Sequence, residues 1–272
     1  MDTYRSKIVL SGNVLEVYYY QEDIKHNFKR FDLTDKKIPD ETLNKMLSNN
    51  EDVPECVKKD KKNTPDCSQE QEKESDIETK KRSLLRSKIR LRRLINANAT
   101  ELDKFVTLTF RKNITDVTKA NQKFEKFKKR LKYRLKKDDK NFDLKYIAVI
   151  EFQKRGAVHY HCLFNISYIK NEQLQKIWRN GFVRINKIDD VDNVGAYVVK
   201  YMSDDIEKYS EQLGSDHKRY LHSRGNLKEP IIVKDDAEVA EILADLDDSD
   251  IAYESEYDTD YFGEVHYRQY KC

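Results

Sequence analysis

The chain has 272 residues, a formal net charge of +3, and 37% charged against 38% hydrophobic residues. This composition supports one core of ordinary size with polar appendages and excludes two large domains. Four cysteines, Cys56, Cys67, Cys162 and Cys272, form no Cys-x-x-Cys pair, which favours a reducing compartment. No signal peptide follows Met1, and no apolar run approaches the roughly 18 residues of a membrane span. We therefore expect a cytoplasmic protein without membrane contact.

Charge is divided unevenly along the chain. Residues 235–272 hold thirteen acidic and two basic residues, a net charge of −11, so residues 1–234 carry about +14. A basic body suits phosphate binding, because each neutralised phosphate releases counterions. A solvated lysine-rich surface is the alternative, and charge alone does not decide between them.

The N-terminal part predicts a small β-structure followed by a linker. Two strand-like runs, Lys7–Leu10 and Val14–Tyr20, flank Gly12 and predict a β-hairpin. We assign residues 1–47 to a β-rich extension. Residues 48–79 are charged, contain two prolines and show no apolar period, so they predict a linker.

Residues 80–95 predict a basic amphipathic helix. Eight of these sixteen positions are Lys or Arg, and leucines and isoleucines are interleaved with them. Such a helix can follow a DNA backbone, with Arg90 and Arg93 among its contacts. It can equally pack on the next domain with its charges in water.

The central part of the chain predicts an α+β domain. The expected elements are strand 104–110, helix 116–137, strand 144–153, strand 157–165, helix 171–180, strand 182–187 and helix 190–204. We expect Thr115 and Asn171 to cap the first two helices and Gly181 to stop the second. The β-α-β-β-α-β order is the ferredoxin-like, split βαβ arrangement with an antiparallel sheet. The two crossover helices should cover one sheet face and leave Thr107 and Thr109 on the open face.

A hairpin in this domain predicts a metal site. Lys154, Arg155 and Gly156 form a three-residue loop, with glycine where a positive φ is needed. This loop places Glu151 opposite His159 and next to His161 on one face, where opposed Cβ atoms lie about 5 Å apart.

Two neutral imidazoles and a carboxylate suit Mn²⁺ or Mg²⁺ and leave positions for a substrate oxygen. Ligand type does not exclude zinc. His-x-His pairs also arise by chance, and two structural histidines are the alternative interpretation.

The last predicted helix of the domain carries two tyrosines. Asp189 or Asp190 can cap it, and its apolar positions recur at helical spacing. Tyr197 and Tyr201 are neighbours at i and i+4, with Lys200 one turn from Tyr197. Tyrosines at this spacing are candidate nucleophiles, although half-buried core residues are the more common case.

Residues 231–272 predict an acidic, partly disordered tail. Val239, Ile242, Leu243 and Leu246 are spaced for a short amphipathic helix that folds on a partner. The tail can bind a protein partner, or it can mimic DNA and compete for the basic groove.

Three of these motifs together resemble the HUH endonucleases, and within them the rolling-circle replication initiators of plasmids and single-stranded DNA phages. The family's metal motif is similar to His159-Tyr160-His161. Its Thr-Leu-Thr strand motif resembles Phe105–Phe110, and its Tyr-x-x-Lys motif matches Tyr197 to Lys200, with Tyr201 as the second tyrosine of the two-tyrosine branch. The resemblance covers about residues 80–230, which would be a nuclease domain with a leading basic helix.

The resemblance implies a metal-dependent tyrosine DNA endonuclease and ligase that acts on single-stranded or hairpin origin DNA. Tyr197 would form a 5′-phosphotyrosine, Tyr201 would serve a second cleavage, and Lys200 would help to activate the phenol. The implied metal is Mn²⁺ or Mg²⁺, and the implied compartment is the cytoplasm of a bacterial host. The predicted metal ligands are Glu151, His159 and His161, and the predicted DNA contacts are Thr107, Thr109, Lys154, Arg155, Arg90 and Arg93.

Two other functions remain open from the sequence. An HUH transposase or mobilisation relaxase would use the same core, although about 100 residues before the core favour an initiator. A non-catalytic ferredoxin-like module that binds nucleic acid is the alternative of a different class. No Gly-x-x-x-x-Gly-Lys-Ser/Thr loop occurs, so we expect a host helicase and polymerase as partners.

Overall fold

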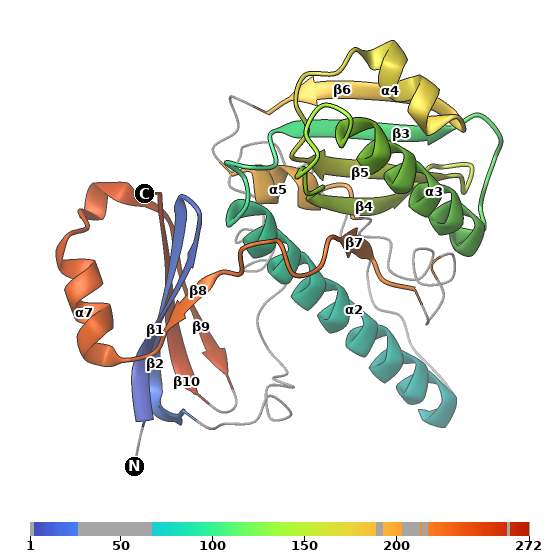
Figure 1. The fold of residues 1–272 in the computed structure, drawn as a ribbon. Helices are drawn as coiled ribbons and strands as arrows, with labels where there is room; N and C mark the ends of the chain where they lie inside the picture. The colour runs from blue at the N-terminus through green and yellow to red at the C-terminus, as the bar shows by residue number, and fades with distance from the viewer. Residues whose placement is uncertain are drawn as a thin grey trace.

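The fold contains two five-stranded antiparallel sheets and belongs to the α+β class, as predicted (Figure 1). The computed structural model describes residues 3–26, 67–188, 193–202, 213, 217–259 and 262–271. Within this described part of the chain, no helix has both the length and the apolar character needed to cross a membrane.

The first sheet, here called the central sheet, has the strand order β6-β3-β5-β4-β7. Its strands are β3 (Lys104–Phe110), β4 (Tyr146–Phe152), β5 (Val158–Phe164), β6 (Gly181–Lys187) and β7 (Tyr220–His222). Strand β5 inserts between β3 and β4, which are joined by a helix, and every neighbouring pair is antiparallel. This is the predicted split βαβ order.

Helices α3 (Val117–Leu135) and α4 (Asn171–Trp178) cover one face of the central sheet. Alternate strand residues point into this layer because side chains on a strand alternate between the two faces. Phe124, Phe127 and Trp178 fill it from the helices, and all three are fully buried. The sheet residues predicted for this core are confirmed: Val106, Leu108, Phe110, Ile150 and Tyr160.

The ends of these helices differ from the prediction by about one residue. Asp116, not Thr115, caps α3 by accepting a hydrogen bond from the Lys119 amide. The N-cap of α4 is Lys170 rather than Asn171. Arg179 takes the left-handed conformation at the end of α4, before the predicted stop at Gly181 is reached.

The opposite face of the central sheet is more covered than predicted. The C-terminal half of α2 (Cys67–Asn96), together with α5 (Val194–Val199), packs on Phe105, Ile147, Val149 and Leu163. Of the described residues on this face, the row nearest the β4–β5 loop stays outside that apolar cluster.

Helix α2 also begins earlier than predicted and includes residues 67–79 of the expected linker. The rest of that linker, residues 48–66, lies outside the described residues. Helix α5 ends at Val199, and the predicted caps Asp189 and Asp190 lie outside the described residues, as do positions 203 and 204 of the expected helix.

The acidic C-terminal segment is folded, which corrects the expectation of a partly disordered tail. It supplies three strands of the second sheet, here called the terminal sheet, which has the order β8-β1-β2-β10-β9. Its strands are β1 (Thr3–Ser11), β2 (Val14–Lys25), β8 (Ile231–Val233), β9 (Ile251–Thr259) and β10 (Gly263–Lys271). Both ends of the described chain therefore lie in one sheet (Figure 1). The expected hairpin of residues 7–20 is confirmed as β1 and β2.

The carboxylates concealed a period-2 pattern in this segment. In β9 the exposed Glu254, Glu256 and Asp258 alternate with less exposed residues that end at the buried Tyr257. The predicted amphipathic helix forms as α7 (Asp236–Ala244). Its Val239 packs on the protein's own strands instead of on a partner protein.

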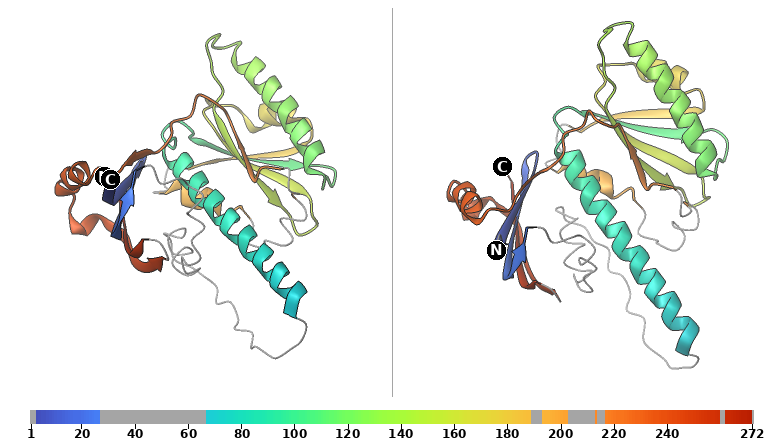
Figure 2. Two further views of the ribbon diagram at one scale, coloured as in Figure 1. Left: turned by 90° about the horizontal axis from the view of Figure 1, so that it is seen from below. Right: turned by 60° about the horizontal axis from the view of Figure 1, so that its bottom comes forward.

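A buried ionic cluster joins the terminal sheet to α2. Glu16 on β2 is 1% exposed, and its carboxylate accepts hydrogen bonds from Arg92 and Arg93. The Tyr267 hydroxyl on β10 donates to the same carboxylate at 3.0 Å. Burial acts to raise the pKa of Glu16, but the charges of Arg93 and Arg92 outweigh it and lower that pKa to about 2. Figure 2 shows the C-terminal end of α2 at the junction of the two sheets.

Replacing Glu16 by alanine should destabilise the protein by about 3–5 kcal/mol, because it leaves the buried Arg92 without its counter-charge. Urea unfolding at pH 7 measures this change. The matched control is Glu254→Ala, which breaks an exposed pair with Arg268 and should cost less than about 1 kcal/mol. Because the folded pKa lies below the ordinary value of 4.5, the Glu16 contribution is complete above pH 4.5 and is lost as pH falls towards 2. Equal costs for the two variants at pH 7 would contradict this assignment.

Candidate active site

The β4–β5 hairpin has the predicted register. Glu151 faces His159, Val149 faces His161, and the Gln153 amide donates to the Ala157 carbonyl at 2.9 Å. Gly156 has φ 80°, as the three-residue loop requires. Glu151, His159 and His161 therefore project from one side of the sheet, here called the histidine face.

A hydrogen-bonded chain crosses three strands on the histidine face. Nε2 of His161 lies 2.5 Å from a Glu151 carboxylate oxygen, and its Nδ1 lies 3.3 Å from the Thr107 hydroxyl. A carboxylate only accepts, so Nε2 carries the proton and the Thr107 hydroxyl donates to Nδ1. The bond to His161, partly opposed by burial, lowers the pKa of Glu151. Thr107, predicted as a DNA contact, thus orients a histidine ring.

His159 lies beside this chain and is less completely satisfied. It is 5% exposed, and its buried Nε2 has no hydrogen-bond partner within the described part of the structure. Burial lowers the pKa of His159, against the opposing charge of Glu151, so the ring remains neutral at neutral pH. A neutral imidazole with a free ring nitrogen is a suitable metal ligand.

These three residues fit a divalent cation by donor chemistry, although they are not drawn together into a tight cluster. Two imidazoles and one carboxylate suit Mn²⁺ or Mg²⁺. Their ligand atoms are not all within 4.8 Å of one another; among the described residues, Glu256, Glu264 and His266 meet that spacing. That second group is exposed on β9 and β10 and was not predicted. Exposed acidic groups commonly lie close together without binding an ion.

Both candidate tyrosines approach the histidine face. The Tyr201 ring stacks on His161, with ring centroids 3.7 Å apart and planes 18° from parallel. Tyr197 packs edge-on against Phe105 at 5.7 Å, and its hydroxyl lies 3.1 Å from that of Tyr201. Burial and the hydrogen bond to Tyr197 raise the pKa of Tyr201. Tyr201, rather than Tyr197, is thus the tyrosine in direct contact with a predicted metal ligand.

Helix α5 is attached to the end of α2 by polar contacts that the sequence did not predict. Asn96, which is 3% exposed, accepts from the Gly195 amide at 2.7 Å and donates to Asn193 at 3.0 Å. The Asn193 side chain caps α5 by accepting from the Ala196 amide. The signal for this contact was Gly195, where a Cβ atom would lie 2.4 Å from the Arg92 carbonyl oxygen.

The predicted DNA contacts fall into two groups. Arg90, Lys154 and Arg155 are exposed, and Thr109 is partly exposed on the histidine face. Arg93 is committed elsewhere, to Glu16 and to the Tyr18 hydroxyl at 2.6 Å. The face of α2 that carries Arg93 therefore packs on the terminal sheet, as the second interpretation of this helix proposed. Lys200 is exposed at the C-cap of α5.

Residues 103–206 match the model of a family of replication-associated proteins, described by the name ORF2. The matched segment contains β3, the histidine hairpin and both tyrosines. No curated protein and no solved structure matches the chain. The match supports a Rep-like replication protein, and this agrees with the coarser level of the resemblance noted from the motifs.

Replacing Gly195 by alanine should force α5 away from α2, because the new Cβ atom would meet backbone and Asn96 atoms at 2.4–2.6 Å. We expect a loss of about 1–3 kcal/mol, the usual cost of overpacking, measured by urea unfolding. Gly195→Ser should cost more, since it adds a further atom in the same place. If stability changed by less than about 0.5 kcal/mol, the close contact between the two helices would be wrong.

Proposed function

We propose that the chain is a metal-dependent, single-strand DNA endonuclease and ligase that initiates rolling-circle replication through a 5′-phosphotyrosine intermediate. The observation that carries the proposal is the stack of Tyr201 on His161, with the Tyr197 hydroxyl 3.1 Å from that of Tyr201. This contact brings two phenols to the same patch as a carboxylate and two imidazoles. The match to replication-associated proteins supports the biological role.

In this proposal Glu151, His159 and His161 hold Mn²⁺ or Mg²⁺. When bound, the ion would neutralise charge on the scissile phosphate and make its phosphorus more electrophilic. The orphaned Nε2 of His159 and the low pKa of Glu151 both favour ligation by the deprotonated forms. Thr107 holds the His161 ring in its orientation through Nδ1.

Tyr197 is the proposed nucleophile. Its oxygen bonds to phosphorus while the bond from phosphorus to the 3′ oxygen breaks; the phenol loses a proton and the leaving oxygen gains one. Tyr201 keeps its proton because its pKa is raised, so its hydroxyl can donate to the Tyr197 oxygen as charge develops. Lys200, exposed one turn beyond Tyr197, would bind a neighbouring phosphate.

The covalent link conserves the energy of the phosphodiester, so the reverse reaction can rejoin the strand. The free 3′-hydroxyl would prime a host polymerase, while a host helicase separates the strands in a bacterial cytoplasm. In a second cleavage Tyr201 would replace Tyr197, since both phenols reach the same place.

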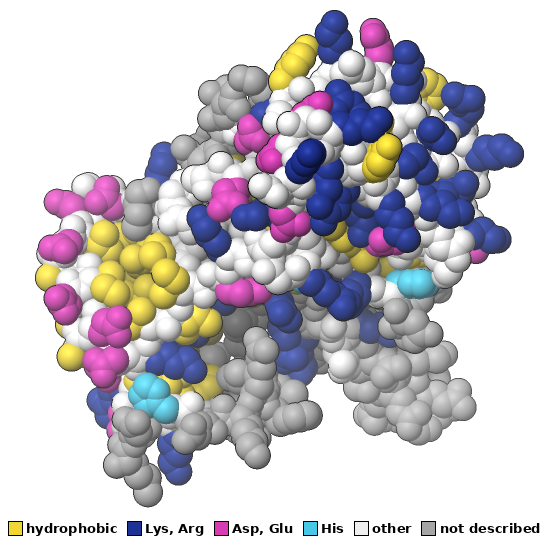
Figure 3. Space-filling view, viewed as in Figure 1, with side chains coloured by type: hydrophobic (Ala, Val, Ile, Leu, Met, Phe, Trp, Pro, Cys, Tyr) yellow, Lys and Arg dark blue, Asp and Glu magenta, His cyan; other side chains and the backbone are white. Residues whose placement is uncertain are grey.

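The distribution of charge supports a polyanionic substrate. Helix α3 carries eight basic residues and one acidic residue in nineteen positions. Figure 3 shows Lys and Arg side chains spread over the α3 and α4 part of the molecule, whereas Asp and Glu gather at the rim of the terminal sheet. The basic body inferred from the sequence is therefore also separated in space from the acidic segment.

A covalent adduct is the decisive test of the nucleophile. Wild-type protein incubated with Mn²⁺ and single-stranded oligonucleotides covering its replicon should give a protein-linked DNA band on a denaturing gel. Tyr197→Phe should remove or reroute the band, and the double variant with Tyr201→Phe should be inert. Tyr133→Phe, at an exposed tyrosine on α3, is the matched control and should leave the band unchanged. A band that persists in the double variant would exclude both tyrosines, and no band in any variant would favour a binding module.

Metal binding can be tested without activity. Saturation with Mn²⁺ at about 100 times its dissociation constant should stabilise the wild type by about 2.7 kcal/mol, seen as a rise in Tm. His159→Ala should abolish most of this shift. His266→Ala is the control because it disrupts the second acidic group, Glu256, Glu264 and His266. A shift that survives in His159→Ala and disappears in His266→Ala would move the metal to the terminal sheet.

A further inference from the structure

An exposed aromatic residue continues the candidate metal row across the sheet. Phe182 on β6 pairs with Thr109 on β3, Thr109 pairs with His159 on β5, and His159 pairs with Glu151 on β4. Directly opposed residues share a face, so Phe182 lies on the histidine face. With strands about 4.8 Å apart, Phe182 lies about 10 Å from His159, one strand beyond Thr109.

Phe182 is unlike the phenylalanines of the neighbouring strand. Its side chain is 60% exposed, whereas Phe105 and Phe110 on β3 are 1% and 2% exposed. Strand β6 forms the edge of the central sheet, so no further strand among the described residues pairs with it. An apolar ring presented to solvent beside a polar cluster indicates a contact surface more than a packing role.

The position of Phe182 is fixed by its surroundings. A Cβ atom on the preceding Gly181 would lie 2.2 Å from the Thr109 carbonyl oxygen, so β6 is pressed closely against β3 at this point. The same carbonyl accepts a hydrogen bond from the Trp178 indole at 3.0 Å. The backbone under Phe182 is therefore rigid, which lowers the entropic cost of holding a ligand on its ring.

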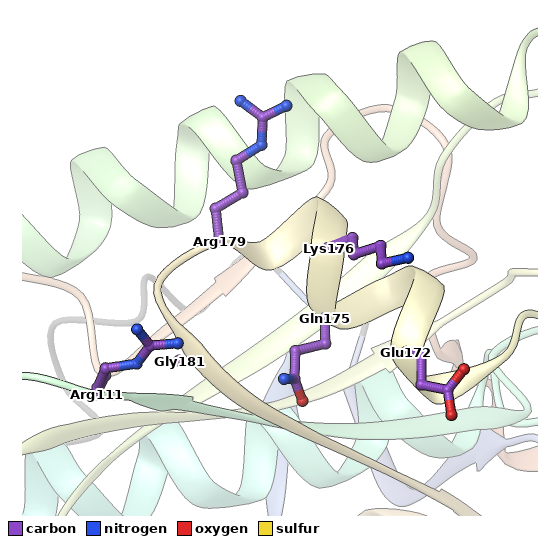
Figure 4. A pocket seen from close by; sticks show the side chains of 6 residues that line it. All are labelled: Arg111, Glu172, Gln175, Lys176, Arg179 and Gly181. Carbon is purple, nitrogen blue, oxygen red and sulfur yellow. The ribbon is translucent and has the colours of Figure 1, made fainter.

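Cationic side chains flank Phe182 on both sides. Arg184 is exposed on the same face, opposite Thr107, and its charge acts to lower the pKa of the nearby Tyr201. On the other side Arg111 lines an open cavity of about 290 Å³ that is bounded by Gly181 and α4. Figure 4 shows the Arg111 side chain directed towards Gly181, with Arg179 pointing away from it. The cavity also contains Lys176 and one carboxylate, Glu172.

We propose that Phe182, Arg184 and Arg111 form a subsite for single-stranded nucleic acid, in which a base stacks on Phe182 and flanking phosphates bind the two guanidinium groups. The subsite rests on the proposed function, since it would hold the strand next to the phosphate that is cut. A planar ring recognises the face of any base, and the arginines supply the matching charge. Paired bases in a duplex do not expose that face, so the occupant is single-stranded.

The test measures binding in EDTA, where no strand is cut. Fluorescence anisotropy compares a labelled fifteen-nucleotide oligo(dT) with an abasic strand of the same length, which has the phosphates but no bases. Phe182→Ala should weaken oligo(dT) binding about 5- to 150-fold, the equivalent of one stacked base, and leave abasic binding unchanged. Phe182→Trp should restore the preference for bases. The matched control, Tyr168→Ala, removes an 83% exposed aromatic ring and should have no effect.

The arginines are separated from the ring by salt dependence. Arg184→Gln and Arg111→Gln should each weaken both oligonucleotides and reduce the slope of log affinity against log salt by about 0.7 per lost phosphate contact. An equal loss of oligo(dT) and abasic binding in Phe182→Ala, or no loss in either, would overturn the subsite.

Failure of the subsite and failure of the proposed chemistry give different results. If the wild type forms a covalent adduct while Phe182→Ala binds oligo(dT) normally, the chemistry stands and the subsite is wrong. If no adduct forms while Phe182→Ala loses its preference for bases, the subsite stands on a protein that binds without cutting.

Discussion

The site depends on the buried contact between Glu16 and Arg92. A carboxylate and a guanidinium removed from water hold together only when both are fully paired, so the last turns of α2 must stay against the terminal sheet. One turn further on, Asn96 binds the first residues of α5, and the Arg92 carbonyl itself limits how closely α5 can approach. The tyrosines are two short turns from there. Their contact with His161 therefore depends on an ion pair formed with a strand near the start of the chain.

This arrangement gives the terminal sheet a positioning role. The central sheet can form its α3 and α4 core without it, because that core uses the other face. The face that bears the histidines is completed by α2 and α5, and α2 contacts both sheets through opposite sides of one helix. A helix packed on two sides has little freedom to move, and this rigidity suits a site whose reacting groups come from separate elements.

Local patterns predicted the central domain well. The three-residue loop at Gly156 set the hairpin register, and the alternation along β3, β4 and β5 identified which residues face α3 and α4. These features depend on neighbours in sequence. The cover on the histidine face comes from α2, whose apolar residues were visible in the sequence but whose packing partners were not. Arg93 looked like a surface charge for the same reason: its partner, Glu16, is 77 residues away.

The acidic segment was misjudged because composition outweighed period. Thirteen carboxylates suggested a chain too charged to fold, yet those on β9 lie on the solvent side of the strand, where a charge keeps its hydration. Phe182 escaped notice for the opposite reason, because an apolar residue within a predicted strand is expected to be inside. Asn96 gave no signal at all, since only a long-range contact with α5 explains its burial.

The pairing of β2 with β10 has a consequence for synthesis on the ribosome. Tyr20 pairs with Val265, so the first hairpin must wait for about 245 more residues before its neighbouring strand exists. At 5–20 residues per second this delay is on the order of ten seconds or more. During that time the edge of β2 is open and Glu16 lacks Tyr267, while every element of the nuclease-like half has already emerged. Assembly of the tyrosine site should therefore be among the last events in the biogenesis of the protein, and newly made chains would be harmless to DNA until they are complete.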